Sequence, residues 1–204
     1  MIDLTKLSQL QLDALKEIGS IGSGHAATAL SHLLKKRVEI KILSSRVIKK
    51  DSLPDFVSGV QGLMVGVSLF ILGEATGKII FLVSRSDALS LVDILMRRKP
   101  GETKILDDLS HSTIKEIANI VSGSYLSAMS DFLNLLLIPS MPHLIADQSE
   151  KVFKSALDDK DISDSIFFIE TQFNDSEKEF SSFFFLIPYV EGIEVILSKI
   201  NTEM

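Results

Sequence analysis

Two stretches of the sequence carry similar polar residues at the same spacing. In EIGSIGSG, Glu17 is followed three residues later by Ser20, and in EIANIVSG, Glu116 is followed three residues later by Asn119. An ionised carboxylate accepts charge-assisted hydrogen bonds from cations, whereas a carboxamide both donates and accepts. Both pairs are therefore candidates for contacting a polar or charged partner, and the first pair has a hydroxyl where the second has an amide.

The two stretches are separated by a constant offset, since 116 − 17 and 119 − 20 both equal 99. When residues 17–34 are aligned with residues 116–133, eight of the eighteen positions are identical. Two copies are too few for a solenoid and favour an internal duplication within one pseudo-symmetric unit. We therefore predict a single domain over residues 1–204, made of two repeats at about 1–103 and 104–204.

Both stretches have the periodicity of an amphipathic helix. At about 100° per residue, each helix gathers four polar or small residues into one stripe on its outer side. The predicted outer stripes are Asp13, Glu17, Ser20 and Gly24 in the first helix, and Ser112, Glu116, Asn119 and Gly123 in the second. Apolar and small residues, among them Gly19, Gly22 and Leu33, fall on the opposite side and are expected to face the core.

Glycine in a helix interior costs about 0.5–1 kcal/mol relative to alanine, so the glycines of these helices need a reason. For Gly19 and Gly22 we favour close packing against the sheet or the other helix. Gly24 and Gly123 leave the outer surface open beyond the polar pair, which would let a partner approach closely. Packing or chance explains that outer pair equally well.

The remaining patterns alternate between strand and helix. We expect strands at 37–43, 63–72, 77–84, 165–173 and 180–188, and helices at 87–98, 107–134, 149–157 and 191–200. Ser86 is the expected cap of the helix at 87–98, which Pro100 and Gly101 should end. Adjacent hairpin-like strands with long helices predict an α/β (α+β) fold, in which the two motif helices pack on one shared, largely antiparallel sheet.

Composition excludes several classes of function. The chain has 46% hydrophobic residues, no cysteine and a net charge of −6, which argues for a folded domain without thiolate catalysis and against nucleic-acid binding. The four histidines have no convincing spacing with carboxylates, so we expect no metal site. No Walker or dinucleotide motif occurs. Without a recognisable signal or membrane span, we expect a cytoplasmic protein that does not bind membranes.

An exposed Asp/Ser-x-x-x-Glu-x-x-Asn stripe that occurs twice, each time followed by glycine, resembles the CheC/CheX/FliY family of chemotaxis phosphatases. The similarity extends from LDALKEIGSIGSGHAATALS through STIKEIANIVSGSYLSAMSDFL to FFLIP. Two motifs without a further domain resemble CheC most closely, because FliY-type proteins carry an additional flagellar-switch domain and CheX-type proteins usually have one motif.

This resemblance implies hydrolysis of the aspartyl phosphate of a CheY-type response regulator. The regulator would supply the Mg²⁺ and a lysine, so the enzyme would need no cofactor of its own. By the same resemblance, Asn119 would orient the attacking water, Glu116 would contact the regulator lysine, and Ser112 would be a peripheral contact.

The first site departs from the family pattern. Asp13, Glu17 and Ser20 would form it, but the serine hydroxyl is shorter than an amide and lacks its carbonyl acceptor. We therefore expect an active second site and a weak or inactive first site, unless Ser20 acts through a second water.

Two other classes of function remain open on the sequence. One is a non-enzymatic module that binds phosphorylated regulator or a CheD-type deamidase, and the other is a structural part of a flagellar switch. The absence of an additional domain counts against the flagellar-switch role. The sequence does not separate the binding module from the phosphatase, because Glu116 would help binding in both, whereas only hydrolysis requires Asn119.

Overall fold

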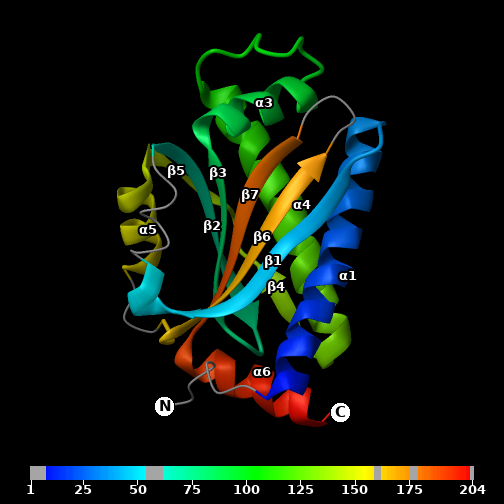
Figure 1. The fold of residues 1–204 in the computed structure, drawn as a ribbon, viewed down its shortest axis with the longest axis vertical. Helices are drawn as coiled ribbons and strands as arrows, with labels where there is room; N and C mark the ends of the chain where they lie inside the picture. The colour runs from blue at the N-terminus through cyan, green and yellow to red at the C-terminus, as the bar shows by residue number, and fades with distance from the viewer. Residues whose placement is uncertain (1–7, 54–61, 159–161, 175–178, 203–204) are drawn as a thin grey trace.

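A computed structural model describes residues 8–53, 62–158, 162–174 and 179–202 (Figure 1). The elements follow one another as α1 (Gln9–Leu34), β1 (Glu39–Lys49), the short 3-10 helix η2 (Lys50–Ser52), β2 (Leu63–Gly73), β3 (Gly77–Ser84), α3 (Arg85–Leu95), α4 (Asp108–Leu133), β4 (Leu137–Pro139), β5 (His143–Gln148), α5 (Ser149–Leu157), β6 (Ser165–Asn174), β7 (Glu179–Pro188) and α6 (Val190–Thr202).

All strands belong to one antiparallel sheet with the order β1-β6-β7-β3-β2-β4, and β5 also pairs with β2. The order is palindromic when each strand is exchanged for its counterpart in the other half, β1 for β4 and β5, β2 for β6, and β3 for β7. An approximate twofold axis therefore passes between the central strands β3 and β7. The predicted α+β fold with a shared, pseudo-symmetric sheet is confirmed.

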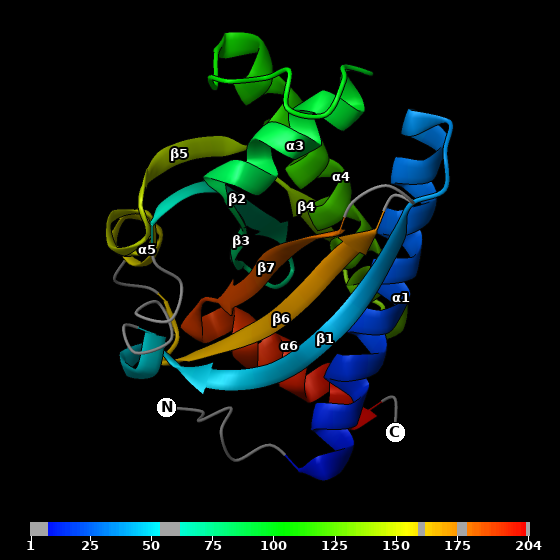
Figure 2. The same cartoon turned by 45° about the horizontal axis from the view of Figure 1, so that its top comes forward.

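The two long helices α1 and α4 lie side by side on one face of this sheet and run in opposite directions (Figures 1 and 2). The main core fills the space between them and the sheet, with Ile18 of α1, Ile117 of α4 and Phe184 of β7 all buried. A second apolar cluster on the other face joins Phe153 of α5 to Phe185 of β7, whose rings meet edge to face. The sheet is thus covered on both faces, as a largely buried sheet requires.

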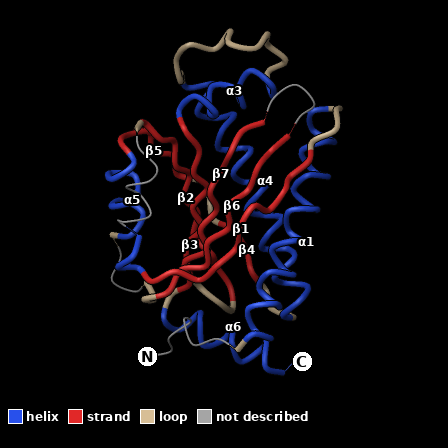
Figure 3. Tube along the Cα trace, in the orientation of Figure 1, coloured by secondary structure: helices blue, strands red, loops and turns tan. Residues whose placement is uncertain are grey.

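Helices α3 and α6 close the two ends of the molecule, α3 beside the N-terminal end of α4 and α6 below β7 (Figure 3). Ser84 caps α3 by accepting a hydrogen bond of 3.0 Å from the backbone N–H of Asp87. The prediction that Ser86 caps this helix is wrong: Ser84 has the extended backbone that an N-cap needs, whereas Ser86 lies within the first turn.

Helix α3 also ends earlier than its pattern predicts. Its last residue is Leu95, and Arg97 has a left-handed backbone with φ of 54°. Arg97 and Arg98 therefore lie beyond the helix and not in its last turn. The first strand is longer than predicted, Glu39–Lys49 in place of 37–43, since its pairing with β6 continues past a register shift between Ile42 and Ser44.

The connection after α4 contains two strands that the sequence analysis missed. The prolines of this segment suggest a loop, but Pro139 lies at the end of the three-residue edge strand β4, where no ladder donor is needed. Leu33, predicted to face the core, is 45% exposed near the C-terminal end of α1.

Candidate functional site

The contact between α1 and α4 fixes how the two polar stripes are placed. A Cβ atom added to Gly22 would lie 2.7 Å from Cδ1 and 3.0 Å from Cα of Tyr125, so glycine allows the closest approach of the helices. The Tyr125 hydroxyl shares a buried hydrogen bond of 2.6 Å with Ser23 Oγ. Its ring stacks on Phe184 of the sheet, with 4.3 Å between centroids. These contacts lock the helices in one register.

Both stripes lie on the outer, solvent side of their helices, as the periodicity predicts. Among the predicted site residues, Asp13, Glu17, Ser20, Gly24, Ser112 and Glu116 are exposed, and Asn119 and Gly123 are half-buried. A Cβ atom added to either outer glycine would meet no atom within 4 Å. The surface next to each polar pair is therefore open to a partner.

The two polar pairs form separate sites, because the helices are antiparallel. Glu17 precedes Gly22 by five residues and Glu116 precedes Tyr125 by nine residues on the opposite helix. At 1.5 Å per residue, the two glutamates are about 20 Å apart along the helix axes. The first pair lies toward the α6 end of the molecule and the second toward the α3 end.

The second site has polar groups that are not engaged within the protein. In the described part of the chain, the side chains of Glu116 and Asn119 have no hydrogen bond or ion pair. Ser112, one turn before Glu116, donates its hydroxyl proton to the backbone carbonyl of Asp108 at 2.9 Å. A carboxylate and an amide one helical turn apart thus remain available to an external group.

The first site is arranged differently. The Ser20 hydroxyl donates to the carbonyl of Lys16 on its own helix at 3.1 Å, which directs its proton away from solvent. Asp13 accepts hydrogen bonds from Gln9 Nε2 at 3.0 Å and from Lys16 Nζ at 3.2 Å. These two bonds, that of Gln9 first, hold the pKa of Asp13 below its usual value. Of the charged residues in this stripe, Glu17 has no such partner within the described chain.

Apolar side chains stand at the edge of each site. Leu10 and Leu109, at equivalent positions of the two repeats, are 59% and 52% exposed. Ile21 and Ile120 beside the stripes are half-buried and pack against the core. The exposed leucines favour a rim that a protein partner could cover, whereas the isoleucines form the edge of the core.

Within the described residues, no three histidine, aspartate or glutamate side chains gather so that they could hold a metal ion. Among the same residues, no helix is long and apolar enough to span a membrane.

Comparison with known proteins adds to this geometry. Residues 10–41 and 109–145 match the model of the CheC-like family, and these two segments contain both polar stripes. The resemblance to the CheC/CheX/FliY family is confirmed. This chain is 26% identical over 203 residues to the CheY-P phosphatase CheC of Bacillus subtilis, covering 97% of both chains.

This chain is also 26% identical over 205 residues to the flagellar motor switch phosphatase FliY of Bacillus subtilis, a match that covers 98% of this chain and 52% of FliY. In structure, this chain is similar to Thermotoga maritima FliY, with a TM-score of 0.80 and 20% identity over 98% of this chain and 100% of that one. That likeness shows the common fold.

Proposed function

We propose that this protein is a phosphatase that hydrolyses the aspartyl phosphate of a CheY-type response regulator. The observation that supports the proposal best is the unengaged Glu116–Asn119 pair on the outer side of α4, next to the open surface at Gly123. The names of two relatives, a CheY-P phosphatase and a flagellar motor switch phosphatase, agree with this reaction.

The residue types suit the chemistry of an acyl phosphate. A regulator holds its own Mg²⁺ and lysine around the phosphoryl group, so that an aligned water is the missing component. The Asn119 amide accepts a hydrogen bond from this water and orients it in line with the phosphorus. Glu116 accepts a charge-assisted hydrogen bond from the regulator lysine and thereby fixes the register of the two proteins.

The first site contributes little to turnover in this proposal. Its Ser20 hydroxyl is bonded to the backbone of α1, and a serine cannot reach as far as an amide. Glu17 keeps the capacity to bind a lysine, so the first site retains the contact but lacks the group that orients water.

Dephosphorylation of a phosphorylated CheY-type regulator tests the proposal, with the wild type, Asn119→Ala and Ser20→Ala compared. Losing a group that stabilises the transition state commonly costs about 10²-fold in rate. We expect that loss for Asn119→Ala with regulator binding nearly unchanged, and no significant change for Ser20→Ala.

Glu116→Lys should impair binding and turnover together, because it reverses the charge that faces the regulator lysine. If Asn119→Ala and Ser20→Ala both keep full turnover, neither residue orients the water. If the wild type itself does not dephosphorylate the regulator, the phosphatase function is rejected in favour of a binding module for phosphorylated regulator or for a CheD-type deamidase. If Ser20→Ala alone abolishes turnover, the first site is the active one and the second contributes little.

A further inference from the structure

A basic pocket lies at the α3 end of the molecule. It has a volume of about 550 Å³ and lies between the C-terminal end of α1 and the segment that joins α3 to α4. Four cationic residues line it, namely Lys35, Lys36, Arg97 and Arg98, and we call them the basic rim. The chain as a whole has a net charge of −6, so the basic rim is a local reversal of charge.

Two of the four cations of the basic rim form no ion pair within the described chain. Within the described chain, the side chains of Lys35 and Arg97 have no hydrogen bond or salt bridge. Arg98 donates to the Thr103 hydroxyl at 2.9 Å, which orients it. The Asp93 carboxylate in the pocket wall accepts from the backbone N–H of Gly101 at 2.7 Å and of Thr103 at 2.8 Å. It therefore shapes the turn and does not neutralise Lys35 or Arg97 directly.

Lys35 and Arg97 share an uncommon backbone conformation. Both have φ of 54°, in the left-handed region that glycine or asparagine occupies most readily at the end of a helix. The structure thus holds a lysine and an arginine where smaller residues would fit the backbone better. A position near helix C-termini favours their charge but leaves their donors free for a ligand.

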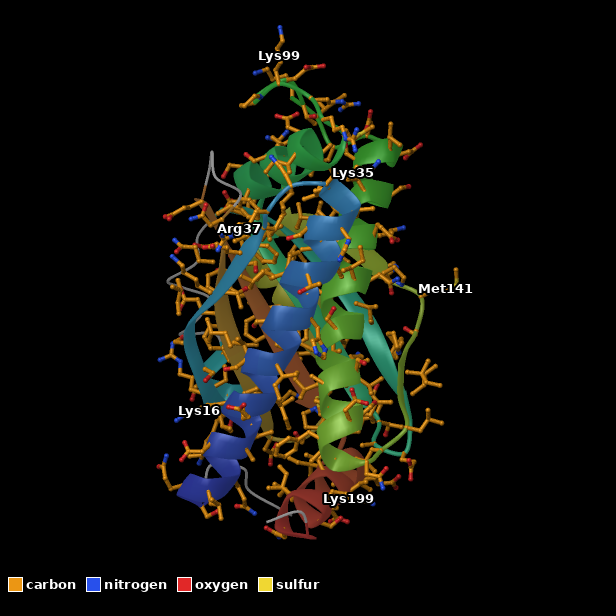
Figure 4. The ribbon with its side chains drawn as sticks, turned by 90° about the vertical axis from the view of Figure 1, so that its right-hand side faces the viewer. Lys16, Lys35, Arg37, Lys99, Met141 and Lys199 are labelled. Atoms are coloured by element: carbon orange, nitrogen blue, oxygen red, sulfur yellow. The ribbon has the colours of Figure 1, made fainter. Side chains whose placement is uncertain are left out.

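The register of the helices places the basic rim beside the second site. Lys35 lies 13 residues after Gly22, and Ser112 lies 13 residues before Tyr125 on the antiparallel helix. Lys35 is therefore level with Ser112, the residue one turn before Glu116. Figure 4 shows Lys35 at the upper end of α1, beside the upper part of α4.

The other end of the molecule has no equivalent basic group at these positions. With the offset of 99, the counterpart of Lys35 is Asn134 and that of Lys36 is Leu135. His32, which precedes Lys35 by one turn, has Asp131 as its counterpart. At these three positions the first site therefore has neutral or acidic residues, whereas the second site has two lysines and a histidine.

From these observations we propose that the basic rim is an electrostatic docking surface that directs the acidic surface of a phosphoprotein to the Glu116–Asn119 site. The inference rests on the proposed function and adds to it the way in which the partner is recognised. A phosphoryl group held among metal-binding carboxylates gives its carrier a negative face. That face is attracted by the basic rim and repelled by the remainder of a chain with net charge −6.

Turnover of a phosphorylated CheY-type regulator at two salt concentrations tests the inference. The double variant Lys35→Gln/Arg97→Gln removes the two unpaired cations, and Lys49→Gln/Lys199→Gln removes two cations elsewhere on the molecule. At about 0.02 M salt, we expect the first variant to lower kcat/KM about tenfold with kcat unchanged. At about 0.5 M salt the difference should disappear, because the charges are screened. The control variant should match the wild type at both concentrations.

Association is measured separately in the Asn119→Ala background, where phosphorylated regulator persists. Slower association after removal of Lys35 and Arg97 supports docking even if no turnover is found, so failure of the phosphatase proposal is distinguishable. Equal association at low salt for both double variants overturns the inference. Binding of inorganic phosphate or pyrophosphate in the pocket, without any effect of the variants on the regulator, would also overturn it in favour of a small-anion site.

Discussion

At the scale of single residues, the two repeats differ most clearly where equivalent side chains have different hydrogen-bond partners. Ser23 and Ser122 are equivalent under the offset of 99, and both are buried. Ser23 bonds the Tyr125 hydroxyl, whereas Ser122 Oγ has no hydrogen-bond partner in the described chain. The reason is that the counterpart of Tyr125 in the first repeat is Ala26, which offers no hydroxyl.

This difference predicts opposite effects of the same substitution on stability. Ser23→Ala leaves the buried Tyr125 hydroxyl unpaired and should lower the free energy of unfolding by about 1–3 kcal/mol. Ser122→Ala removes an unsatisfied hydroxyl and should be neutral or stabilising by up to about 1 kcal/mol. Urea unfolding of the two variants beside the wild type measures both values. Equal destabilisation by the two substitutions would contradict the assignment.

Tyr125 also predicts a dependence of stability on high pH. Burial raises its pKa to about 12, against a smaller lowering effect of the bond to Ser23. The folded state keeps the proton that the unfolded state releases near pH 10, so the free energy of unfolding should fall between about pH 10 and pH 12. A rise of the Tyr125 pKa from 10.0 to about 12 corresponds to about 3 kcal/mol in the free energy of unfolding.

Denaturant unfolding at pH 9 to 12, compared with Tyr125→Phe, isolates this contribution because other groups titrate in both proteins. The stability of the phenylalanine variant should decline less over this range. Parallel pH curves for the two proteins would show that Tyr125 does not make this contribution.

At the scale of elements, the contact of α1 with α4 explains why glycine occurs on both sides of the same helix. Gly22 allows the helix backbone to approach Tyr125, whereas Gly24 and Gly123 face open space. The sequence alone predicted the inner and outer placement of these glycines from the helical period. Only the packed pair shows which glycine the contact requires.

We expect Gly22→Ala to lower the free energy of unfolding by about 1–3 kcal/mol, because its Cβ would overlap Tyr125 and push the helices apart. Gly24→Ala and Gly123→Ala should each raise it by about 0.5–1 kcal/mol, since alanine favours the helix and meets no neighbour. Thermal unfolding of the three variants beside the wild type measures the order of their stabilities.

Gly123→Ala has a second use, as a probe of partner access. If a regulator closely approaches the surface next to Asn119, this variant should be more stable but slower in turnover. Unchanged turnover would show that Gly123 is not part of the contact surface.

At the scale of the whole molecule, the pseudo-twofold axis gives the protein two equivalent helix surfaces but not two equivalent environments. The basic rim lies at the α3 end, where Lys35 is level with Ser112, one turn before Glu116. At the equivalent positions around the first site, Asp13 stands in place of Ser112 and Asp131 in place of His32. Restoring the amide at the first site is therefore not sufficient to make the two sites equal.

We predict that Ser20→Asn, made in the Asn119→Ala background, restores only a small part of the turnover of the wild type. Adding Asp131→Lys should increase it further, because the acidic flank that repels the regulator is replaced by a basic one. Initial rates of regulator dephosphorylation at low salt measure both steps. Full activity from Ser20→Asn alone would show that the flanks of the sites have no role.

The sequence by itself determined the features that depend on local periodicity and on the constant offset. The outer stripes of α1 and α4, the strand-rich segments and the pseudo-symmetric α+β fold follow from patterns within a few residues, because the periods of helix and strand dictate which residues share a face. The difference between Ser20 and its counterpart Asn119 is likewise visible in the sequence.

Only the tertiary structure decided what depends on contacts between distant segments. Three such features are the pairing of β4 and β5 with β2, the hydrogen bond of Ser23 to Tyr125, and the pocket that both Lys35 and Arg97 line. Each joins residues far apart in the chain. No local pattern encodes these distances, since they arise when the antiparallel helices settle on the sheet in the register set by Gly22 and Tyr125. That register separates the two polar pairs and places the basic rim beside the second one.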